Sequence, residues 1–294
     1  KFFRRHCTIW MFMMREIREY DWILVMDADI AVINPNKFVL LTLYFCLTFC
    51  VFRLIEDYID MRFDITLFDR FFNFEVAALS YLVRNTKVAR EFVDQFARME
   101  FKLPDTLAHG TDNGALHPYL MELLAPGPSP IKDMCYRIWN VSSAAYDLFQ
   151  METCTRMVMG DRIEYPEKNL RILRKGTAWV RDLWLLHGFW SEDDFMFHGA
   201  KEANFREYSK EKDDPTNMTT EDMIVWLPLE KKHAYVFPLI EELDLATCSN
   251  GNSRWVLDGR LKISNQLRRK VLRKFENGVI KMKLAFIGQM AKFF

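Results

Sequence analysis

The sequence predicts an α/β domain built on a mainly parallel sheet with flanking helices. One observation is Trp22–Met26, a run of five apolar residues that is typical of a strand buried on both faces. Another is the stretch Arg4–Tyr20, whose apolar residues recur at helical spacing. A helix that leads into a buried strand closes a βαβ unit. The first residue is Lys and no earlier strand is present, so we expect one or more N-terminal strands to be missing.

The composition excludes several classes of protein. Half of the 294 residues are hydrophobic, which suffices for a large buried core and excludes wholesale disorder. The formal net charge is zero, which argues against a nucleic-acid partner. The six cysteines form no C-x-x-C pair, so neither a zinc site nor a thioredoxin-like motif is indicated. Sequons at Asn140 and Asn217 permit N-glycosylation if the chain enters the secretory pathway.

Two carboxylates follow the first strand directly. Asp27 and Asp29 form the only D-x-D triplet of the chain. Open α/β sheets bind ligands beyond the carboxyl ends of their strands, and two aspartates one residue apart can both face one hard cation. The triplet therefore predicts a divalent metal site. The alternative is a pair of solvated carboxylates at a strand end.

Residues 38–52 form an atypical apolar insertion without a charge. As a helix the segment would span about 22 Å, short of the roughly 30 Å of a bilayer core, so we do not expect a membrane span. A core helix is a second interpretation, but the segment has no distinct apolar face. A third is a translated intron, which the presence of the segment in abundant mature transcripts would exclude.

The middle of the chain alternates strand and helix signals. The expected elements are a short helix at Arg53–Asp60, strands at Phe63–Phe68 and Val76–Val83, and helices at Lys87–Phe101 and Thr111–Leu124. Asn85-Thr86 should cap the first of these longer helices. The rigid loop Pro126–Pro130 is a candidate boundary between lobes.

The last third is more polar. An apolar run over Asp194–Gly199 contains His198, and the charged stretch Lys201–Asp222 is expected at the surface. Leu261–Phe294 predicts a basic amphipathic helix with a solvated face or a partner contact.

Four motifs occur in a fixed order. They are Asp27-Ala28-Asp29, the stretch Phe72–Thr86, Gly110–Leu116 and His198–Lys201. In this order they resemble GT-A-type glycosyltransferases, most closely a nematode-expanded group of uncharacterised glycosyltransferase-like proteins. They are more distantly similar to the galactosyl-, mannosyl- and xylosyltransferase family of fungi and plants. The resemblance implies a GT-A-like (Rossmann-like) domain over residues 1–202, and leaves residues 203–294 as a charged, largely helical extension.

The resemblance also assigns residues to roles. It implies Mn²⁺ or Mg²⁺ held by Asp27, Asp29 and His198, donor binding by Asp27, Asp29, Asn73 and Lys201, and positioning of the donor sugar by Asp112 and Asn113. Each assignment has a simpler alternative. His198 could be a core histidine, Asp112 a carboxylate that stabilises a helix N-terminus, and Asn73 a residue that pairs backbone groups in a bend. Glu75 stands where the distant relatives have Gly.

The resemblance implies a glycosyltransferase that moves a sugar from a UDP- or GDP-linked donor to a glycan or protein hydroxyl. The families that the chain resembles act with retention, and an inverting outcome stays open. The enzyme would act in the Golgi lumen or after secretion, with membrane anchoring only through a missing N-terminal segment, and this truncated form could be inactive. One alternative is a non-catalytic carbohydrate-binding relative. Another is a phosphatase or phosphotransferase with Asp27 as nucleophile, although that class favours Thr or Val where Ala31 stands.

Overall fold

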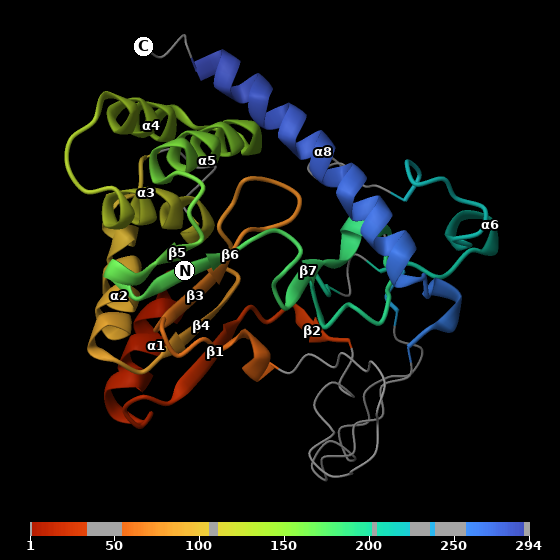
Figure 1. The fold of residues 1–294 in the computed structure, drawn as a ribbon, viewed down its shortest axis with the longest axis horizontal. Helices are drawn as coiled ribbons and strands as arrows, with labels where there is room; N and C mark the ends of the chain where they lie inside the picture. The colour runs from red at the N-terminus through yellow and green to blue at the C-terminus, as the bar shows by residue number, and fades with distance from the viewer. Residues whose placement is uncertain are drawn as a thin grey trace. The chain divides into compact units, whose positions relative to one another are not determined.

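The computed structural model describes residues 2–33, 55–105, 111–201, 205–223, 236–238 and 257–290 (Figure 1). The chain forms two compact units, each assembled from separate segments. Unit 1 contains Lys1–Met26, Ile59–Ala178 and Gly278–Phe294; unit 2 contains Asp27–Tyr58 and Trp179–Asn277. These interleaved units differ from the expected linear division after residue 202, which stays a prediction. The apolar segment 38–52 lies outside the described residues.

Unit 1 contains a five-stranded sheet with the order β1-β4-β3-β6-β5. Its strands are β1 (Trp22–Met26), β3 (Ile65–Phe68), β4 (Ser80–Arg84), β5 (Glu164–Tyr165) and β6 (Leu170–Leu173). β3 pairs with β6 in parallel, whereas the other three pairs are antiparallel. It follows that β1, β3 and β6 run in one direction and that β4 and β5 run against them.

The expectation of a mainly parallel sheet is wrong. The strand at Trp22–Met26 is present, but it pairs along its whole length with the antiparallel β4, from Trp22 opposite Arg84 to Met26 opposite Ser80. An apolar run reports how deeply a strand is buried and carries no information on the direction of its neighbour. Even the burial is partial, because β1 is half-exposed at one edge of the sheet while β3 is buried throughout. The fold is mixed α/β with mostly antiparallel sheets.

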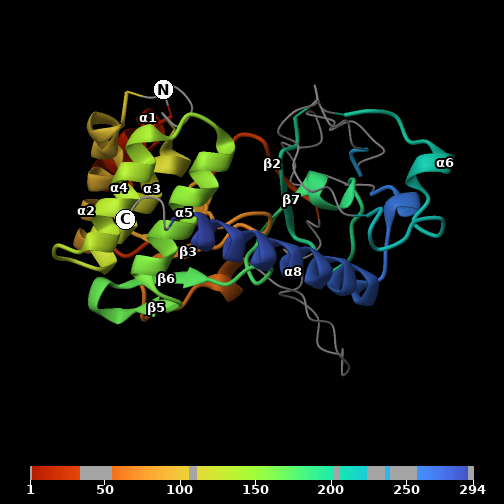
Figure 2. The same ribbon diagram turned by 90° about the horizontal axis from the view of Figure 1, so that it is seen from above.

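Five of the described helices lie wholly within unit 1. They are α1 (Arg4–Arg15), α2 (Lys87–Arg98), α3 (Asp112–Leu124), α4 (Pro130–Val141) and α5 (Ala145–Met159). The three helices predicted in this region are therefore confirmed, with shifted ends. Thr86 caps α2, because its hydroxyl accepts a hydrogen bond from the Ala89 N–H at 3.3 Å. Figure 2 shows α1 and α2 beside each other, and α3, α4 and α5 as a second group.

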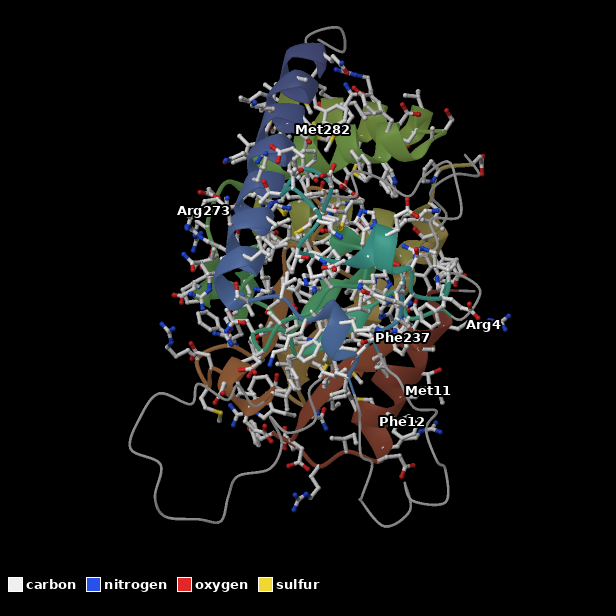
Figure 3. All side chains as sticks on the ribbon, turned by 90° about the vertical axis from the view of Figure 1, so that its right-hand side faces the viewer. Arg4, Met11, Phe12, Phe237, Arg273 and Met282 are labelled. Carbon is white, nitrogen blue, oxygen red and sulfur yellow. A yellow bond between two sulfur atoms is a disulfide. The ribbon has the colours of Figure 1, made fainter. Side chains whose placement is uncertain are left out.

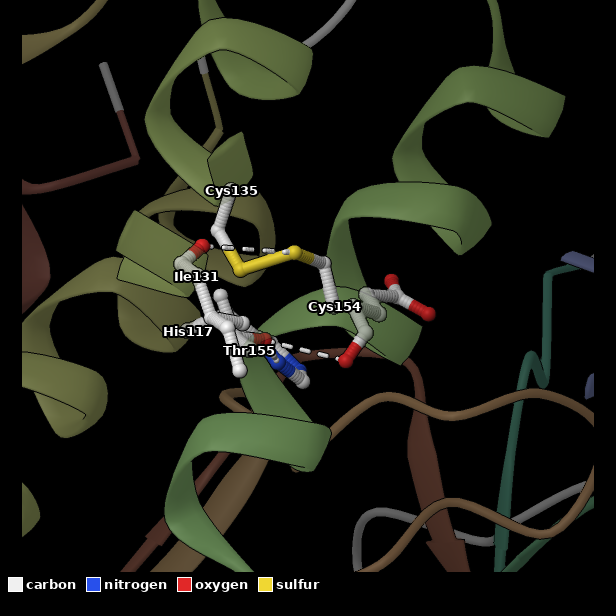
Figure 4. Close-up of a disulfide and its surroundings, with 6 residues drawn as sticks. His117, Ile131, Cys135, Cys154 and Thr155 are labelled. Atoms are coloured by element: carbon white, nitrogen blue, oxygen red, sulfur yellow. Dashed lines mark hydrogen bonds between the residues drawn. A yellow bond between two sulfur atoms is a disulfide. The ribbon is translucent and has the colours of Figure 1, made fainter. Parts of the chain in front are cut away.

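The disulfide Cys135–Cys154 joins α4 to α5, with the two Cα atoms 5.4 Å apart (Figure 4). The loop before α4 lies inside unit 1, so the lobe boundary expected at Pro126–Pro130 is wrong. Pro130 instead occupies the first turn of α4. The Lys132 ammonium binds the carbonyl oxygens of Ala125 and Gly127 and thereby ties this loop to the helix.

Unit 2 contains a three-stranded sheet with the order β2-β8-β7. Its strands are β2 (Ile30–Val32), β7 (Val180–Asp182) and β8 (Met196–His198). The central strand β8 is antiparallel to β2 and parallel to β7. The apolar run over Asp194–Gly199 therefore contains a strand, and this strand forms the middle of the sheet.

The C-terminal helix α8 (Asn265–Met290) confirms the helix predicted in the tail. Some of its apolar side chains, such as Val271, Phe275 and Phe286, are buried, whereas Ile280 and Leu284 are exposed. Charged residues such as Arg273 also lie on the exposed side (Figure 3). No described helix has the length and apolar character needed to cross a membrane. The remaining helical elements are α6 (Lys210–Asp213) and 3-10 turns at Ile55–Tyr58, Met99–Lys102, Pro166–Lys168, Leu183–Leu186 and Gly259–Leu261.

Candidate metal centre

Asp27, Asp29 and His198 lie together in unit 2. One ligand atom from each residue lies within 4.8 Å of the other two. Strand pairing explains the convergence, because Ile30 of β2 stands directly opposite His198 of β8. The D-x-D turn that precedes β2 is therefore held at the end of β8, although the two segments are far apart in the sequence.

Backbone hydrogen bonds fix this arrangement. The N–H groups of Gly199 and Ala200 both donate to the Asp29 carbonyl oxygen, at 3.0 and 2.9 Å. Within the turn, the Ile30 N–H donates to the Asp27 carbonyl oxygen at 3.2 Å. Gly199 has a φ of 91°, a backbone conformation that residues other than glycine rarely adopt. The glycine after His198 is thus needed for the chain to turn back onto the D-x-D backbone.

A residue that no motif indicated completes the surroundings of His198. The Nδ1 atom of the imidazole lies 2.7 Å from Oδ1 of Asp182, whose side chain is 3% exposed. The opposite ring nitrogen, Nε2, lies 3.6 Å from Oδ1 of Asp29. Asp182 was missed because its relation to His198 comes from the pairing of β7 with β8, where the two residues are opposite each other. No local pattern in the sequence records that register.

Lys201 also reaches this cluster. Its Nζ atom lies 3.1 Å from Oδ2 of Asp29, and its side chain is 62% exposed. The ammonium is therefore an exposed counter-ion for one carboxylate, and an incoming anion can reach it from solvent.

The donor set fits a divalent cation. A cation about 2.1 Å from each ligand holds ligand atoms roughly 3 to 4 Å apart, so the three residues need to close only slightly around it. Two carboxylates brought this close repel each other, and a cation relieves that repulsion. Mg²⁺ prefers oxygen ligands alone, whereas Mn²⁺ accepts carboxylate and imidazole together. The chemistry of Asp27, Asp29 and His198 therefore favours Mn²⁺.

Asp112 and Asn113 lie in unit 1, at the start of α3. The Asp112 carboxylate is buried and receives contacts from Arg5 at 2.6 Å and from His6 Nε2 at 3.0 Å. Burial alone would raise the pKa of Asp112, but the His6 hydrogen bond and the Arg5 charge lower it below its ordinary value. The hydroxyl of Tyr81 lies 2.8 Å from His6 Nδ1.

These contacts make Asp112 the centre of an internal network that the sequence did not reveal. Its other oxygen accepts from the Asn113 N–H at 3.0 Å. The side-chain oxygen of Asn113 is buried and has no hydrogen-bond partner among the described residues.

Asn73 is also fully buried in unit 1. Its amide donates to Oε2 of Glu75 at 3.2 Å, and its oxygen accepts from the Glu75 N–H at 3.2 Å. Glu75 pairs in turn with Arg70 at 3.3 Å. Asn73 therefore stabilises a bend, as the backbone-pairing interpretation predicts.

The expected site residues thus divide between the two units. Asp27, Asp29, His198 and Lys201 belong to unit 2, where the structure brings them together. Asn73, Asp112 and Asn113 belong to unit 1, and their expected roles at a donor sugar stay predictions.

Comparison with known families gives one match. The match is to a family described as protein of unknown function, DUF273, and it covers residues 1–214. No curated protein and no solved structure is significantly similar to the chain. The matched region includes both aspartates of the D-x-D triplet, His198 and Lys201. The chain belongs to the DUF273 family.

Proposed function

We propose that the chain is a metal-dependent glycosyltransferase that moves a sugar from a nucleotide-sugar donor to a hydroxyl of a glycan or protein. The observation that carries the proposal is the convergence of Asp27, Asp29 and His198 in unit 2, with Lys201 at its exposed side. A donor set of this kind, with an exposed ammonium paired to one of its carboxylates, suits the diphosphate of a UDP- or GDP-linked sugar.

The residues divide the work as follows. Asp27, Asp29 and His198 would hold Mn²⁺, which when bound supplies Lewis-acid stabilisation to the departing diphosphate. Lys201 would leave Asp29 and bind a phosphate oxygen with its compact charge. Among the described residues three would be ligands, which would leave further positions of the cation for the donor.

A GT-A-like fold is part of the proposal. It is supported by the shared direction of β1, β3 and β6 and by the position of the D-x-D triplet immediately after β1. Ligand binding beyond the carboxyl end of such a strand is common in α/β sheets. Transfer with retention rests on the resemblance alone.

We also propose that the protein acts in the secretory pathway, in the Golgi lumen or after secretion. The Cys135–Cys154 disulfide supports this, because such bonds persist in oxidising compartments. Asn140 and Asn217 of the two sequons are both exposed and accessible to a glycan. A loss of apparent mass after enzymatic removal of N-glycans from the natural protein would agree with this location, and an unchanged mass would argue against it.

The test is a thermal-shift series with UDP and GDP, each with and without Mn²⁺. A ligand that binds only the folded state raises its melting temperature. We expect stabilisation that needs nucleotide and Mn²⁺ together, and that is lost in His198→Ala. The nucleotide that produces the shift then selects the sugar donors for a transfer assay. Nucleotide stabilisation that is the same without metal and in His198→Ala would overturn the proposal.

A second candidate, a non-catalytic carbohydrate-binding protein of the same fold, is favoured by one observation. The Asp112 carboxylate is held by Arg5 and His6, and the Asn73 amide is held by Glu75, so both polar groups already have partners inside unit 1. Sugar binding without any turnover of the donor would identify this function. Release of sugar from the donor would exclude it.

A further inference from the structure

We infer that Asp182 is a positioning residue for His198: it keeps the imidazole protonated at Nδ1 and presents Nε2 to a divalent cation shared with the D-x-D carboxylates. The inference rests on the metal site of the proposed function. It adds a residue to that site which neither the motifs nor the family match indicates.

The strand order of the three-stranded sheet places His198 between two other strands. β8 is the central strand, so His198 has a partner on each side, Ile30 of β2 and Asp182 of β7. β2 brings the D-x-D turn to one side of the imidazole, and β7 brings a buried carboxylate to the other. The ring is therefore held between Asp29 at 3.6 Å from Nε2 and Asp182 at 2.7 Å from Nδ1.

The hydrogen bond with Asp182 determines which nitrogen of the His198 ring carries the proton. An ionised carboxylate only accepts hydrogen bonds, so a 2.7 Å contact with Asp182 requires the proton on Nδ1. A neutral imidazole has one N–H, so a proton on Nδ1 leaves a lone pair on Nε2 that can bind a cation. A free imidazole favours the opposite tautomer, in which Nε2 carries the proton and cannot be a ligand. Asp182 therefore selects the tautomer that metal binding needs.

The buried position of Asp182 strengthens its hydrogen bond with His198. Its side chain is 3% exposed, whereas those of Asp29 and His198 are 16% and 14% exposed. Water competes little for a buried carboxylate, so the hydrogen bond to Nδ1 is strong and the ring has one orientation. A carboxylate behind a ligating histidine also makes the ligand nitrogen a better electron donor.

The experiment measures Mn²⁺ affinity, from the resonance signal of the free ion, in the wild-type chain and in variants. Loss of such a partner typically weakens metal binding by about 10- to 100-fold, which we expect for Asp182→Ala. Asp182→Asn should lose less, because the amide oxygen can still accept from Nδ1. In a His198→Ala background, Asp182→Ala should cause no further loss, because Asp182 acts through the imidazole.

The matched control is Asp193→Ala, which removes a carboxylate of unit 2 that pairs with Arg269 at 2.9 Å. Its Mn²⁺ affinity should equal that of the wild type. A second measurement needs no metal: nitrogen-15 spectra of the His198 ring should show a protonated Nδ1 in the wild type and a shift toward protonated Nε2 in Asp182→Ala. A merely structural carboxylate would not move this tautomer signal.

The outcomes separate this inference from the proposed function. The role of Asp182 would be overturned if Asp182→Ala bound Mn²⁺ as tightly as the wild type. It would also be overturned if Asp182→Ala weakened Mn²⁺ binding as much in the His198→Ala background as in the wild type. In both cases the metal site itself would stand. A wild-type chain that binds no Mn²⁺ would overturn both. If Asp182→Ala does not fold, Asp182→Leu, which also removes the acceptor but fills more of the buried space, decides by the same two measurements.

Discussion

Each unit contains a histidine hydrogen-bonded to a buried aspartate, and the two pairs are built in opposite ways. In unit 1, His6 and Asp112 are both nearly inaccessible, and the guanidinium of Arg5 supplies a positive charge at 2.6 Å. In unit 2, His198 lies 2.7 Å from Asp182 through Nδ1 and 3.6 Å from the partly exposed Asp29 through Nε2. The first pair is closed within the protein, whereas the second has a face that remains open to a ligand.

The difference lies in how the charge is balanced. The network around Asp112 contains its own cation, so the carboxylate stays ionised although burial opposes it. In the metal cluster, two carboxylates approach each other and the positive partner of Asp29 is the exposed Lys201. The Asp112 network thus contains its own positive group, whereas the metal cluster brings two carboxylates together, an arrangement that a cation stabilises.

Glu152 shows a third way to bury a carboxyl group. It is fully buried in α5, and burial followed by the nearby charge of Glu75 raises its pKa well above the ordinary value. Both of its carboxyl oxygens lack a hydrogen-bond partner among the described residues. Burial and the Glu75 charge thus favour the protonated form of Glu152, whereas Arg5 and His6 favour the ionised form of Asp112.

The largest expected change in stability is for Asp112→Ala. Removal of one partner from a buried, hydrogen-bonded ion pair leaves Arg5 and His6 uncompensated, and should lower the free energy of unfolding by about 3–5 kcal/mol. Urea unfolding measures the loss. Asp94→Ala is the control, because it breaks an exposed pair with Arg98 and should cost less than about 0.5 kcal/mol. Equal small losses in both variants would show that the Asp112 network is not structural.

Asp29→Ala should weaken Mn²⁺ binding without lowering the free energy of unfolding. We expect Mn²⁺ affinity to fall by about 100-fold or more, the upper end of the losses seen even for outer partners of metal ligands. Unfolding without metal should be unchanged or require more urea, because a repulsive carboxylate is gone. Titration with Mn²⁺ and urea unfolding measure the two effects. A loss of stability as large as that of Asp112→Ala, with Mn²⁺ binding intact, would show that Asp29 stabilises the fold and is not a metal ligand.

Glu152→Gln tests whether the buried carboxyl group of Glu152 makes the free energy of unfolding depend on pH. A raised pKa in the folded state means that the stability contributed by Glu152 is complete below its ordinary pKa and is lost as pH rises. The wild-type free energy of unfolding should therefore fall by up to about 1.4 kcal/mol per pH unit in this window. Glu152→Gln should remove that slope and be the more stable protein at neutral pH.

The control for this slope is Glu167→Gln, which changes an exposed carboxylate that pairs with Arg162. It should retain the wild-type pH dependence above its ordinary pKa. Identical slopes in the wild type and in Glu152→Gln would show that the buried carboxyl group is not protonated in the folded state.

The smallest expected effect is that of Lys201→Ala on the cation alone. An exposed ion pair contributes at most about 1 kcal/mol, so its removal should leave Mn²⁺ affinity unchanged or raise it up to about fivefold. Nucleotide binding in the presence of Mn²⁺ should weaken, because the phosphate partner is lost. Lys262→Ala, which removes another exposed ammonium of unit 2, should change neither titration. Weaker Mn²⁺ binding in Lys201→Ala alone would contradict the assigned role.

Local patterns predicted the elements well where they depend on neighbours in sequence. The strand Trp22–Met26 and the helices that became α2 and α3 follow from apolar spacing, and the Thr86 cap follows from residue type. Strand direction was predicted wrongly, because it depends on how distant segments pair. The helices α4 and α5 were not predicted, although the buried Met134, Cys135, Ile138 and Trp139 of α4 lie at helical spacing.

The sequence by itself determined the ligand types of the candidate site: two aspartates one residue apart, and a histidine followed by a glycine that can turn the chain. Only the tertiary structure decided that these groups converge, that Asp182 stands behind His198, and that Asp112 is enclosed by Arg5 and His6. The physical reason is that strand register and helix packing are set by contacts between residues far apart in the chain. Spacing along the sequence does not record those contacts.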